Sequence, residues 1–258
     1  MTGDQHGTDG TDGTDGTDGT EPSAGRPVRG GRQPLSRDLI VSTAIEMADA
    51  EGVTGVTMRR LGQRLGVEAM SLYRYVNGRE DLLEGVTSQL VDQVSSDPEG
   101  QLTSSDGWQA YLQWFAHSVR DVAIAHPLLF PLIATRHPGA TWLRPPLRSV
   151  RIVEDFLDAL IARGLSERQA VGVYRTFTSF LLGHLLLETV NLGATTAPAE
   201  DPLDEGGAAL PSGDADLDLA DYPTVQRLRP ILSEDHTAAE FEQGLEALLD
   251  RMDLQLSQ

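Results

Sequence analysis

The residues of this chain that are best suited to chemistry are arginines, tyrosines and small polar side chains grouped in residues 57–83. Arginine binds phosphate oxygens and can pair with guanine through two hydrogen bonds, and tyrosine and threonine hydroxyls also hold phosphates. Small side chains such as Ala69 and Ser71 allow close approach to a base edge or a thymine methyl group. The chemistry that this stretch predicts is recognition of double-stranded DNA.

Two sets of candidate contacts follow from the expected orientation of the helices. Base edges would be read by Ala69, Met70, Ser71 and Arg74. Phosphates would be held by Thr57, Arg59, Tyr73, Tyr75 and Arg79. The pattern alone leaves one alternative open, a helical hairpin on the surface with ordinary tyrosines.

The distribution of charge decides how the formal net charge of −19 is interpreted. Taken whole, that charge argues against DNA, because attraction to DNA comes from basic side chains facing phosphates. All 20 basic residues are arginines, and residues 26–79 hold nine of them against five acids, which gives +4. Residues 1–25 sum to −6 and residues 80–258 to −17. One basic segment inside an acidic protein is typical of a nucleic-acid-binding module.

Several other classes of protein are disfavoured. The absence of cysteine excludes disulfides, thiolate metal sites and a cysteine nucleophile. No stretch of about 18 apolar residues predicts a membrane span, and the N-terminus does not resemble a secretory signal, so we expect a cytoplasmic protein. The six histidines are scattered, and no Glu-x-x-His, His-Glu-x-x-His or Gly-x-Ser-x-Gly motif occurs. We therefore predict no catalytic residues, no cofactor and no metal.

The elements that must position the basic residues are helices, because apolar residues recur with helical spacing and strand-like alternation is absent. Ser36 is placed to cap a first helix that ends at Gly52. Thr57 would cap a helix from Met58 to Leu65, Gly66 would make the turn, and a second helix would run from Glu68 to Val76. This is the helix-turn-helix arrangement within an all-α fold.

Later helices are indicated by their starts. Asp106 precedes an apolar face that ends before Pro127. Capping boxes are predicted in three places, which are Asn77 with Glu80, Ser166 with Gln169 and Thr237 with Glu240. The box at Ser166 would open a long apolar helix that reaches about Leu192.

Two segments lack the pattern of a folded element. Residues 1–33 form a leader with four Thr-Asp-Gly repeats, which we expect to be disordered. Residues 193–221 form an acidic, proline-containing stretch that predicts a flexible loop. The expected domains are therefore a helix-turn-helix domain over 34–80 and a helical ligand-binding and dimerisation domain over 81–258.

Residues 36–83 resemble the DNA-binding domain of the tetracycline-repressor (TetR) family. The resemblance is carried by Val56-Thr57-Met58-Arg59-Arg60-Leu61-Gly62 and by Leu65-Gly66-Val67-Glu68-Ala69-Met70-Ser71-Leu72-Tyr73-Arg74-Tyr75-Val76, with Arg79 at the basic position that follows. Residues 241–250 are similar to the last helix of the branch that includes the tetracycline repressors, and residues 135–138 resemble their Thr-Arg-Pro segment. The resemblance implies a homodimer that binds a palindromic operator and is released by a small-molecule effector.

The same resemblance guides expectations for the acidic remainder. Helices 166–192 and 241–252 would form a four-helix bundle across a dimer axis, unless both simply fill the core of a monomer. Candidate effector contacts are Trp108, Phe115, His117, Phe130, Trp142, Tyr174, Phe177, His184 and Glu188. Glu188 occupies the position of an acidic residue near the magnesium–drug complex of tetracycline-binding members. Their histidine is replaced here by Leu132 or Ile133, so we do not expect magnesium–tetracycline.

Two other functions remain as alternatives at this point. The basic helix-turn-helix domain (residues 34–80, called the head below) could be a protein-interaction module on a helical small-molecule-binding protein. Alternatively, the chain could be an all-α enzyme.

Overall fold

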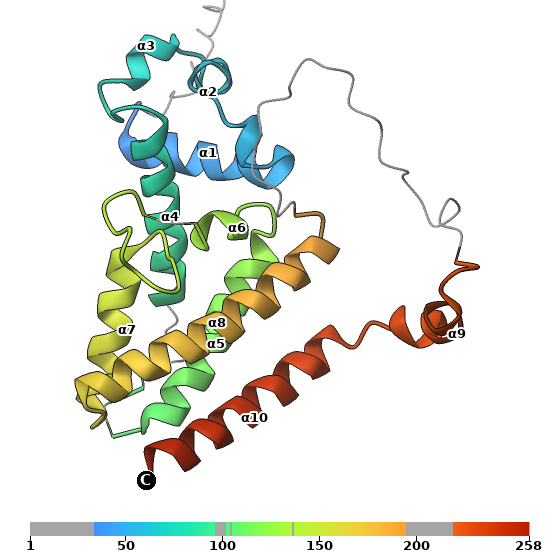
Figure 1. Ribbon diagram of the computed structural model, residues 1–258. Coiled ribbons are helices and arrows are strands. Elements are labelled where there is room, and N and C mark those ends of the chain that lie inside the picture. Colours follow the sequence, from blue (N-terminus) through green and yellow to red (C-terminus); the bar gives the residue numbers. More distant parts are fainter. Residues whose placement is uncertain (1–33, 96–101, 104, 136, 195–218, 258) are drawn as a thin grey trace, which may run out of the picture. The chain divides into compact units, whose positions relative to one another are not determined.

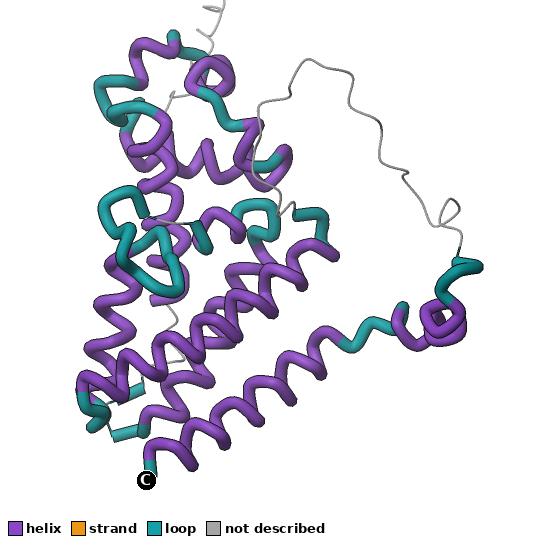
Figure 2. The backbone as a smooth tube through the Cα atoms, viewed as in Figure 1, coloured by secondary structure: helices purple, strands orange, loops and turns teal. Residues whose placement is uncertain are grey.

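The structure is a computed structural model, and it describes residues 34–95, 102–103, 105–135, 137–194 and 219–257. The expected leader (1–33) and most of the expected acidic loop (195–218) lie outside the described residues. Within the described ranges every regular element is a helix and no strand occurs (Figure 2), which confirms the all-α prediction. In chain order the elements are α1 (Arg37–Glu51), η1 (Val53–Gly55), α2 (Met58–Leu65), α3 (Ala69–Leu72), α4 (Arg79–Ser95), α5 (Trp108–Ala125), α6 (Phe130–Ile133), α7 (Val150–Ala162), α8 (Glu167–Asn191), α9 (Pro223–Leu232) and α10 (Thr237–Leu256).

The first two helices of the N-terminal head begin where the sequence predicts. Ser36 Oγ accepts a hydrogen bond from the Leu39 amide (3.2 Å), and Thr57 Oγ1 accepts one from the Arg60 amide (3.3 Å). Both side chains satisfy amide groups that have no partner within the first turn of a helix. Gly66 ends α2 with φ 67° and ψ 35°, a left-handed conformation that glycine adopts without a steric penalty.

The helices α2 and α3 lie close together because Gly62 has no side chain. A Cβ atom at that position would stand 2.9 Å from the Val67 carbonyl oxygen and 3.1 Å from the Ala69 amide nitrogen. Leu61 of α2 and Leu72 of α3 are fully buried, in the same apolar cluster as the buried residues of α1. Close backbone approach and apolar burial together hold the pair that is shown in blue and teal in Figure 1.

The second helix of the pair is shorter than the sequence predicts. It ends at Leu72, and residues 73–75 form a turn, whereas the pattern predicts a helix from Glu68 to Val76. The amides of both Tyr75 and Val76 donate to the Leu72 carbonyl, at 2.9 and 3.1 Å. The spacing of Leu72 and Val76 does not distinguish the two structures, because Leu72 before the turn and Val76 after it are both buried, as they would be in a longer helix.

The prediction of a capping box at Asn77 and Glu80 is wrong. The carboxylate that binds the Asn77 amide belongs to Asp81, whose Oδ2 accepts at 2.7 Å. Glu80 instead forms an ion pair with Arg148. Both Glu80 and Asp81 lie in the first turn of α4, where a carboxylate can bind the backbone amides that precede the helix. Asp81 does so, and Glu80 binds Arg148 instead.

Of the two later capping boxes, one is confirmed and one is wrong. Ser166 and Gln169 satisfy each other's amides at the start of α8. Thr237 caps nothing, because it is itself the first residue of α10 and its hydroxyl donates to Asp235 Oδ1 (2.7 Å).

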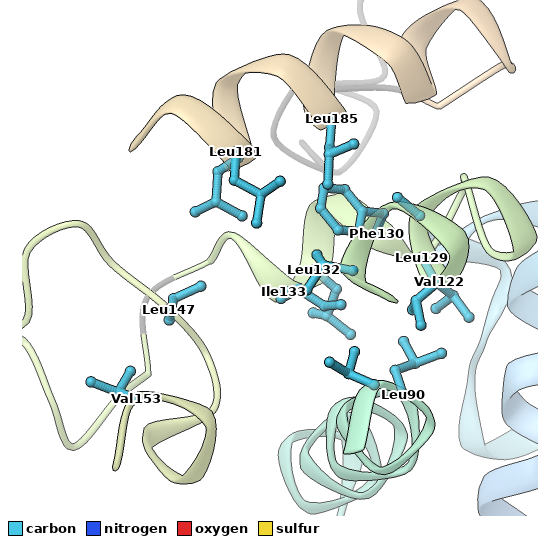
Figure 3. Packing of buried hydrophobic residues seen from close by; sticks show 14 of the residues in the cluster. Leu90, Val122, Leu129, Phe130, Leu132, Ile133, Leu147, Val153, Leu181 and Leu185 are labelled. Atoms are coloured by element: carbon cyan, nitrogen blue, oxygen red, sulfur yellow. The ribbon is translucent and has the colours of Figure 1, made fainter. Parts of the chain in front are cut away.

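The core of the C-terminal part is built around α6, α8 and the adjacent face of α4. Figure 3 shows Leu181 and Leu185 of α8 pointing toward the short helix α6 with its Phe130. Leu90 of α4 lies on the other side of this cluster, and Phe130, Leu185 and Leu90 are all completely buried. Full burial of side chains of this size contributes about 1.5–3 kcal/mol each to folding.

The long helix α8 runs beside α10 in the opposite direction (Figure 1). Gly244 of α10 allows close approach, because a Cβ atom there would lie 2.9 Å from the Phe180 ring. By length and composition alone α8 could cross a membrane, yet it also packs on α5 and α7 and buries ten of its residues. A core helix explains its apolar character.

Candidate nucleic-acid interface

The short helix α3 carries three of the four expected base contacts, which are Ala69, Met70 and Ser71. Met70 is 72% exposed, Ala69 and Ser71 are partly exposed, and Leu72 is completely buried. Because α3 contains only four residues, Arg74 lies exposed in the turn that follows rather than on the helix. The candidate base contacts therefore come from a helix tip and from the turn after it.

Two tyrosines in that turn expose a large part of their rings. Tyr73 is 47% exposed and Tyr75 is 39% exposed, and neither hydroxyl bonds to another described residue. Thr57 is exposed as well, but its hydroxyl oxygen already caps α2. The two phenols are thus free to donate to an acceptor outside the protein, such as a phosphate oxygen.

Three arginines of the head are bound to the protein itself. Arg37 donates to the Tyr75 carbonyl (3.1 Å) and to Asp81. Arg60 binds Gly55 and Glu51, and Arg79 donates from Nη2 to the Val53 carbonyl oxygen (3.0 Å). Arg79, which the sequence places among the phosphate contacts, therefore also ties the start of α4 to η1.

Three other arginines are exposed and form no ion pair or side-chain hydrogen bond with any described residue. They are Arg59, Arg64 and Arg74. Sequence reasoning does not single out Arg64, since nothing in the sequence separates it from Arg60. The structure distinguishes them, because Arg60 is bound to Glu51 and Gly55, whereas Arg64 is exposed to solvent.

The ion pair between Arg37 and Asp81 lies next to the turn formed by residues 73–75, called the tyrosine turn below. The Arg37 guanidinium lowers the pKa of the Asp81 carboxyl by hydrogen bonding, and the Asn77 amide lowers it further. The same carboxylate raises the pKa of the arginine. Both groups therefore stay charged, and the C-terminal end of the turn is held by Arg37 at Tyr75 and by Asp81 at Asn77.

Polar contacts also connect the head and α4 with the C-terminal core. His126 at the end of α5 lies 2.9 Å from Asp49 of α1. On α4, Glu80 accepts from Arg148 (2.8 Å) and Glu84 from His137 (2.9 Å). The loop before α7 therefore binds two acidic side chains of α4.

The aromatic candidates for effector binding separate into core and surface. Phe130 and Phe177 are completely buried, and Tyr174 is buried with its hydroxyl donating to the Pro145 carbonyl (3.0 Å). Trp142 is 71% exposed, and Trp108 packs partly buried against the core. None of these five lines a described cavity.

The polar candidates lie together where α5, α8 and α10 meet. Glu188 accepts two hydrogen bonds from Arg120, at 2.6 and 3.1 Å, and His117 lies 3.0 Å from Glu242. His184 lies against Phe180 and Phe241, and its Nε2 is buried with no hydrogen-bond partner among the described residues. The Glu188 carboxylate is therefore already neutralised by an arginine. Among the described residues, no three His, Asp or Glu side chains gather in a way that could hold a metal ion.

Of the expected effector contacts, Phe115 alone faces a described cavity. This cavity has a volume of about 390 Å³, and its wall includes Tyr111, Trp114 and Arg163, which sequence reasoning does not single out as effector contacts. A larger groove of about 690 Å³ lies along α4, but the arginines and acids in its wall are largely engaged with one another.

Comparison with known families assigns both parts of the chain. Residues 40–86 match the family described as bacterial regulatory proteins, tetR family. Residues 101–256 match the tetracyclin repressor-like C-terminal domain. The transcriptional repressor DrrR1 of Streptomyces coeruleorubidus is 28% identical over 237 residues, which cover 90% of this chain and 83% of that protein.

Solved structures show the same fold. A possible TetR family regulator from Streptomyces coelicolor A3(2) superposes with a TM-score of 0.62 at 27% identity, covering 85% of this chain and 99% of that one. ActR of Streptomyces coelicolor, solved in complex with actinorhodin, superposes with a TM-score of 0.59 at 23% identity, covering 86% and 97%.

Proposed function

Since the chain belongs to the tetracycline-repressor (TetR) family of DNA-binding transcriptional regulators, which are not enzymes, we propose how it binds its operator and what releases it. The protein binds a palindromic operator as a homodimer and represses the adjacent gene. A small-molecule effector in the C-terminal core releases it. As a DNA-binding regulator of transcription, it acts in the cytoplasm.

The observation that carries the DNA-binding geometry is the contrast between the two groups of arginines. Arg59 and Arg64 on α2 and Arg74 in the turn after α3 are exposed and unpaired among the described residues. In this proposal Met70, Ala69 and Ser71 enter the major groove together with Arg74. Tyr73, Tyr75, Arg59 and Arg64 contact phosphates, with Thr57 and Arg79 at the edge of the footprint.

An open face of α8 supports the homodimer. Leu187 is 72% exposed and Val190 is 41% exposed, and a Cβ atom on Gly183 would meet nothing within 4 Å. These three positions follow one another at helical spacing, so they form one apolar stripe with a small residue that permits close helix contact. A second copy of the chain would cover this stripe and place two recognition helices on two half-sites.

Release by an effector needs a path from the core to the head, and α4 provides one. Its first turn carries Asp81 in the head network, and Glu80 and Glu84 hold the loop before α7. An effector shifts the equilibrium only to the extent that it prefers the arrangement of the core in which the two heads no longer match the operator. The repressor named DrrR1 and the ligand-bound ActR agree with this proposal.

Selection of bound duplexes from a random pool tests the proposal. We expect one enriched palindrome whose half-sites lie about 10–10.5 base pairs apart, or a multiple of that spacing, centre to centre. Enrichment of an asymmetric single site would contradict the dimer, and no enrichment would favour a head that binds proteins.

A further inference from the structure

A cavity with an aromatic wall lies between α5, α7 and the last turn of α4. Its volume is about 390 Å³, within the range of roughly 300–1,000 Å³ typical of small-molecule sites. The wall consists of Val94, Leu102, Tyr111, Trp114, Phe115, Ile152, Asp155, Ala159 and Arg163. Apolar and aromatic side chains therefore dominate it, and three polar groups lie among them.

The aromatic side of the cavity is firmly supported. The ring centroids of Tyr111 and Trp114 lie 5.8 Å apart, and those of Tyr111 and Phe115 lie 6.0 Å apart. Behind them, Phe156 lies 5.1 Å from Phe115 and stacks on Phe177 at 5.7 Å. Because buried Phe156 and Phe177 fix the rings from behind, the wall is preorganised for a flat hydrophobic partner.

One cation in the wall, Arg163, forms no ion pair within 4 Å among the described residues, although Asp106 lies close enough for the two charges to attract each other. The guanidinium of Arg163 donates to the backbone carbonyls of Ala159, Leu102 and Thr103 and lies 4.6 Å above the Tyr111 ring. It forms no ion pair with any described residue, and its Nε is buried without a hydrogen-bond partner. A partly buried positive charge whose only direct contacts are carbonyls and a ring, with Asp106 acting on it from beyond ion-pair distance, favours an added anion.

The other polar groups set the number and place of that negative charge. Burial raises the pKa of the Tyr111 phenol, so its hydroxyl stays neutral and can donate. Asp155 also lines the cavity, with a largely exposed carboxylate 4.0 Å from Arg151 Nε. The cavity therefore offers a cation and a phenol to one anionic group, while Asp155 repels a second.

From this arrangement we infer that the cavity is the effector site and that it takes a planar aromatic molecule carrying a single negative group, such as a carboxylate. The inference rests on the proposed function, in which an effector releases DNA. Val94 lies in the last full turn of α4, so an occupant touches the helix whose first turn binds the head.

Calorimetric titration of the full chain with 2-naphthoate and with its neutral analogue 2-naphthamide tests the inference. We expect naphthoate to bind at least tenfold more tightly than naphthamide, because only the carboxylate pairs with Arg163. Arg163→Gln abolishes this difference while leaving naphthamide binding within twofold. Arg168→Gln, at an exposed arginine on α8, serves as the matched control and retains the parent preference.

A second variant covers the case in which Arg163→Gln does not fold. Ala159→Leu adds volume at the cavity wall and keeps the arginine, so it should weaken both probes at least tenfold without changing the circular dichroism spectrum. If naphthoate does not bind the parent chain, or if both variants bind it as the parent does, the inference is overturned.

Operator binding measured in the same samples separates this inference from the proposed function. A parent protein that binds its selected operator but is indifferent to naphthoate contradicts the cavity assignment alone. A parent protein that binds naphthoate as expected but binds no duplex contradicts the proposed function alone.

Discussion

The guanidinium of Arg37 lies 2.6 Å from the carboxylate of Asp81 and also donates to the Tyr75 carbonyl, so one arginine joins the start of α1 to the last residue of the turn 73–75 and to the first turn of α4. Asp81 extends the link by accepting from the Asn77 amide. No side chain in this network is a proposed DNA contact. Its role is to fix the turn that carries Tyr73 and Tyr75.

Loss of that link is expected to weaken operator binding indirectly. Asp81→Asn removes the ion pair and part of the hold on the turn, which we expect to cost roughly 0.5–1.5 kcal/mol of head stability. Operator affinity should fall about three- to tenfold with an unchanged salt dependence, because no phosphate contact is lost. Anisotropy titrations at several salt concentrations measure both quantities, and a flattened salt slope would show that Asp81 acts in another way.

The same pair predicts an acid dependence of stability. The folded pKa of Asp81 lies below its ordinary value of about 3.9, so its contribution is full above that value and is lost as the pH falls through the folded pKa. Denaturant unfolding of parent and Asp81→Asn protein between pH 6 and acid conditions tests this. The two stabilities should converge as the pH falls, and a constant difference would contradict the assignment.

Arg74 and Arg79 are expected to differ in what they contribute. Arg74→Ala should reduce discrimination between the operator and a scrambled duplex by about 1–3 kcal/mol, because the proposed base contact would be lost. Arg79→Ala should weaken binding to both duplexes alike and lower the stability of the head, because its bond to Val53 is lost. Titration of each variant against both duplexes, with thermal unfolding, separates the roles. Equal discrimination in parent and Arg74→Ala would remove Arg74 from the reading set.

The open stripe on α8 (Gly183, Leu187 and Val190) predicts where a charge would separate the proposed dimer. Leu187→Glu would bury a carboxylate against the partner, so we expect monomers at micromolar concentration by light scattering. Val171→Glu is the matched control, because Val171 is also exposed on α8 but lies about 160° around the helix from Leu187. A dimeric Leu187→Glu protein would place the interface elsewhere.

Tyr174 offers a test of the core that does not depend on DNA. Burial raises its pKa to about 12, above the ordinary value of about 10, so the folded state holds the proton more tightly. Its stabilising contribution is full below pH 10 and is lost as the pH rises toward 12. Tyr174→Phe should cost about 1–3 kcal/mol at pH 7, because the Pro145 carbonyl loses its donor, and should flatten the alkaline decline in stability. A parental decline would contradict this.

The helix starts and the helix-turn-helix could be predicted because they depend on local chemistry. Ser36, Thr57, Gly66 and Ser166 satisfy backbone groups within a few residues of themselves, so their types and spacing suffice. The length of α3 could not be predicted in this way, because Val76 is as deeply buried after the turn as it would be in a longer helix.

The contacts between distant residues could not be predicted from spacing. Arg60 and Arg64 are equivalent by sequence, and only the fold brings Glu51 and Gly55 to the former. In the core, the aromatic composition indicated a pocket but not which rings would face it, and Phe130 and Phe177 are fully buried. The position of Arg163, directly after α7, over the ring of Tyr111 arises from the packing of α7 against α5.

The salt dependence of operator binding tests the central claim most directly, namely that the unpaired arginines of the head hold DNA. The measurement compares the parent with a variant in which Arg59, Arg64 and Arg74 are all alanine, and with Arg168→Ala as control. Four of the six arginines removed from the proposed dimer are phosphate contacts, so the slope of log K against log salt should flatten by about 3.6, and the control should match the parent. An unchanged slope in the triple variant would contradict the account.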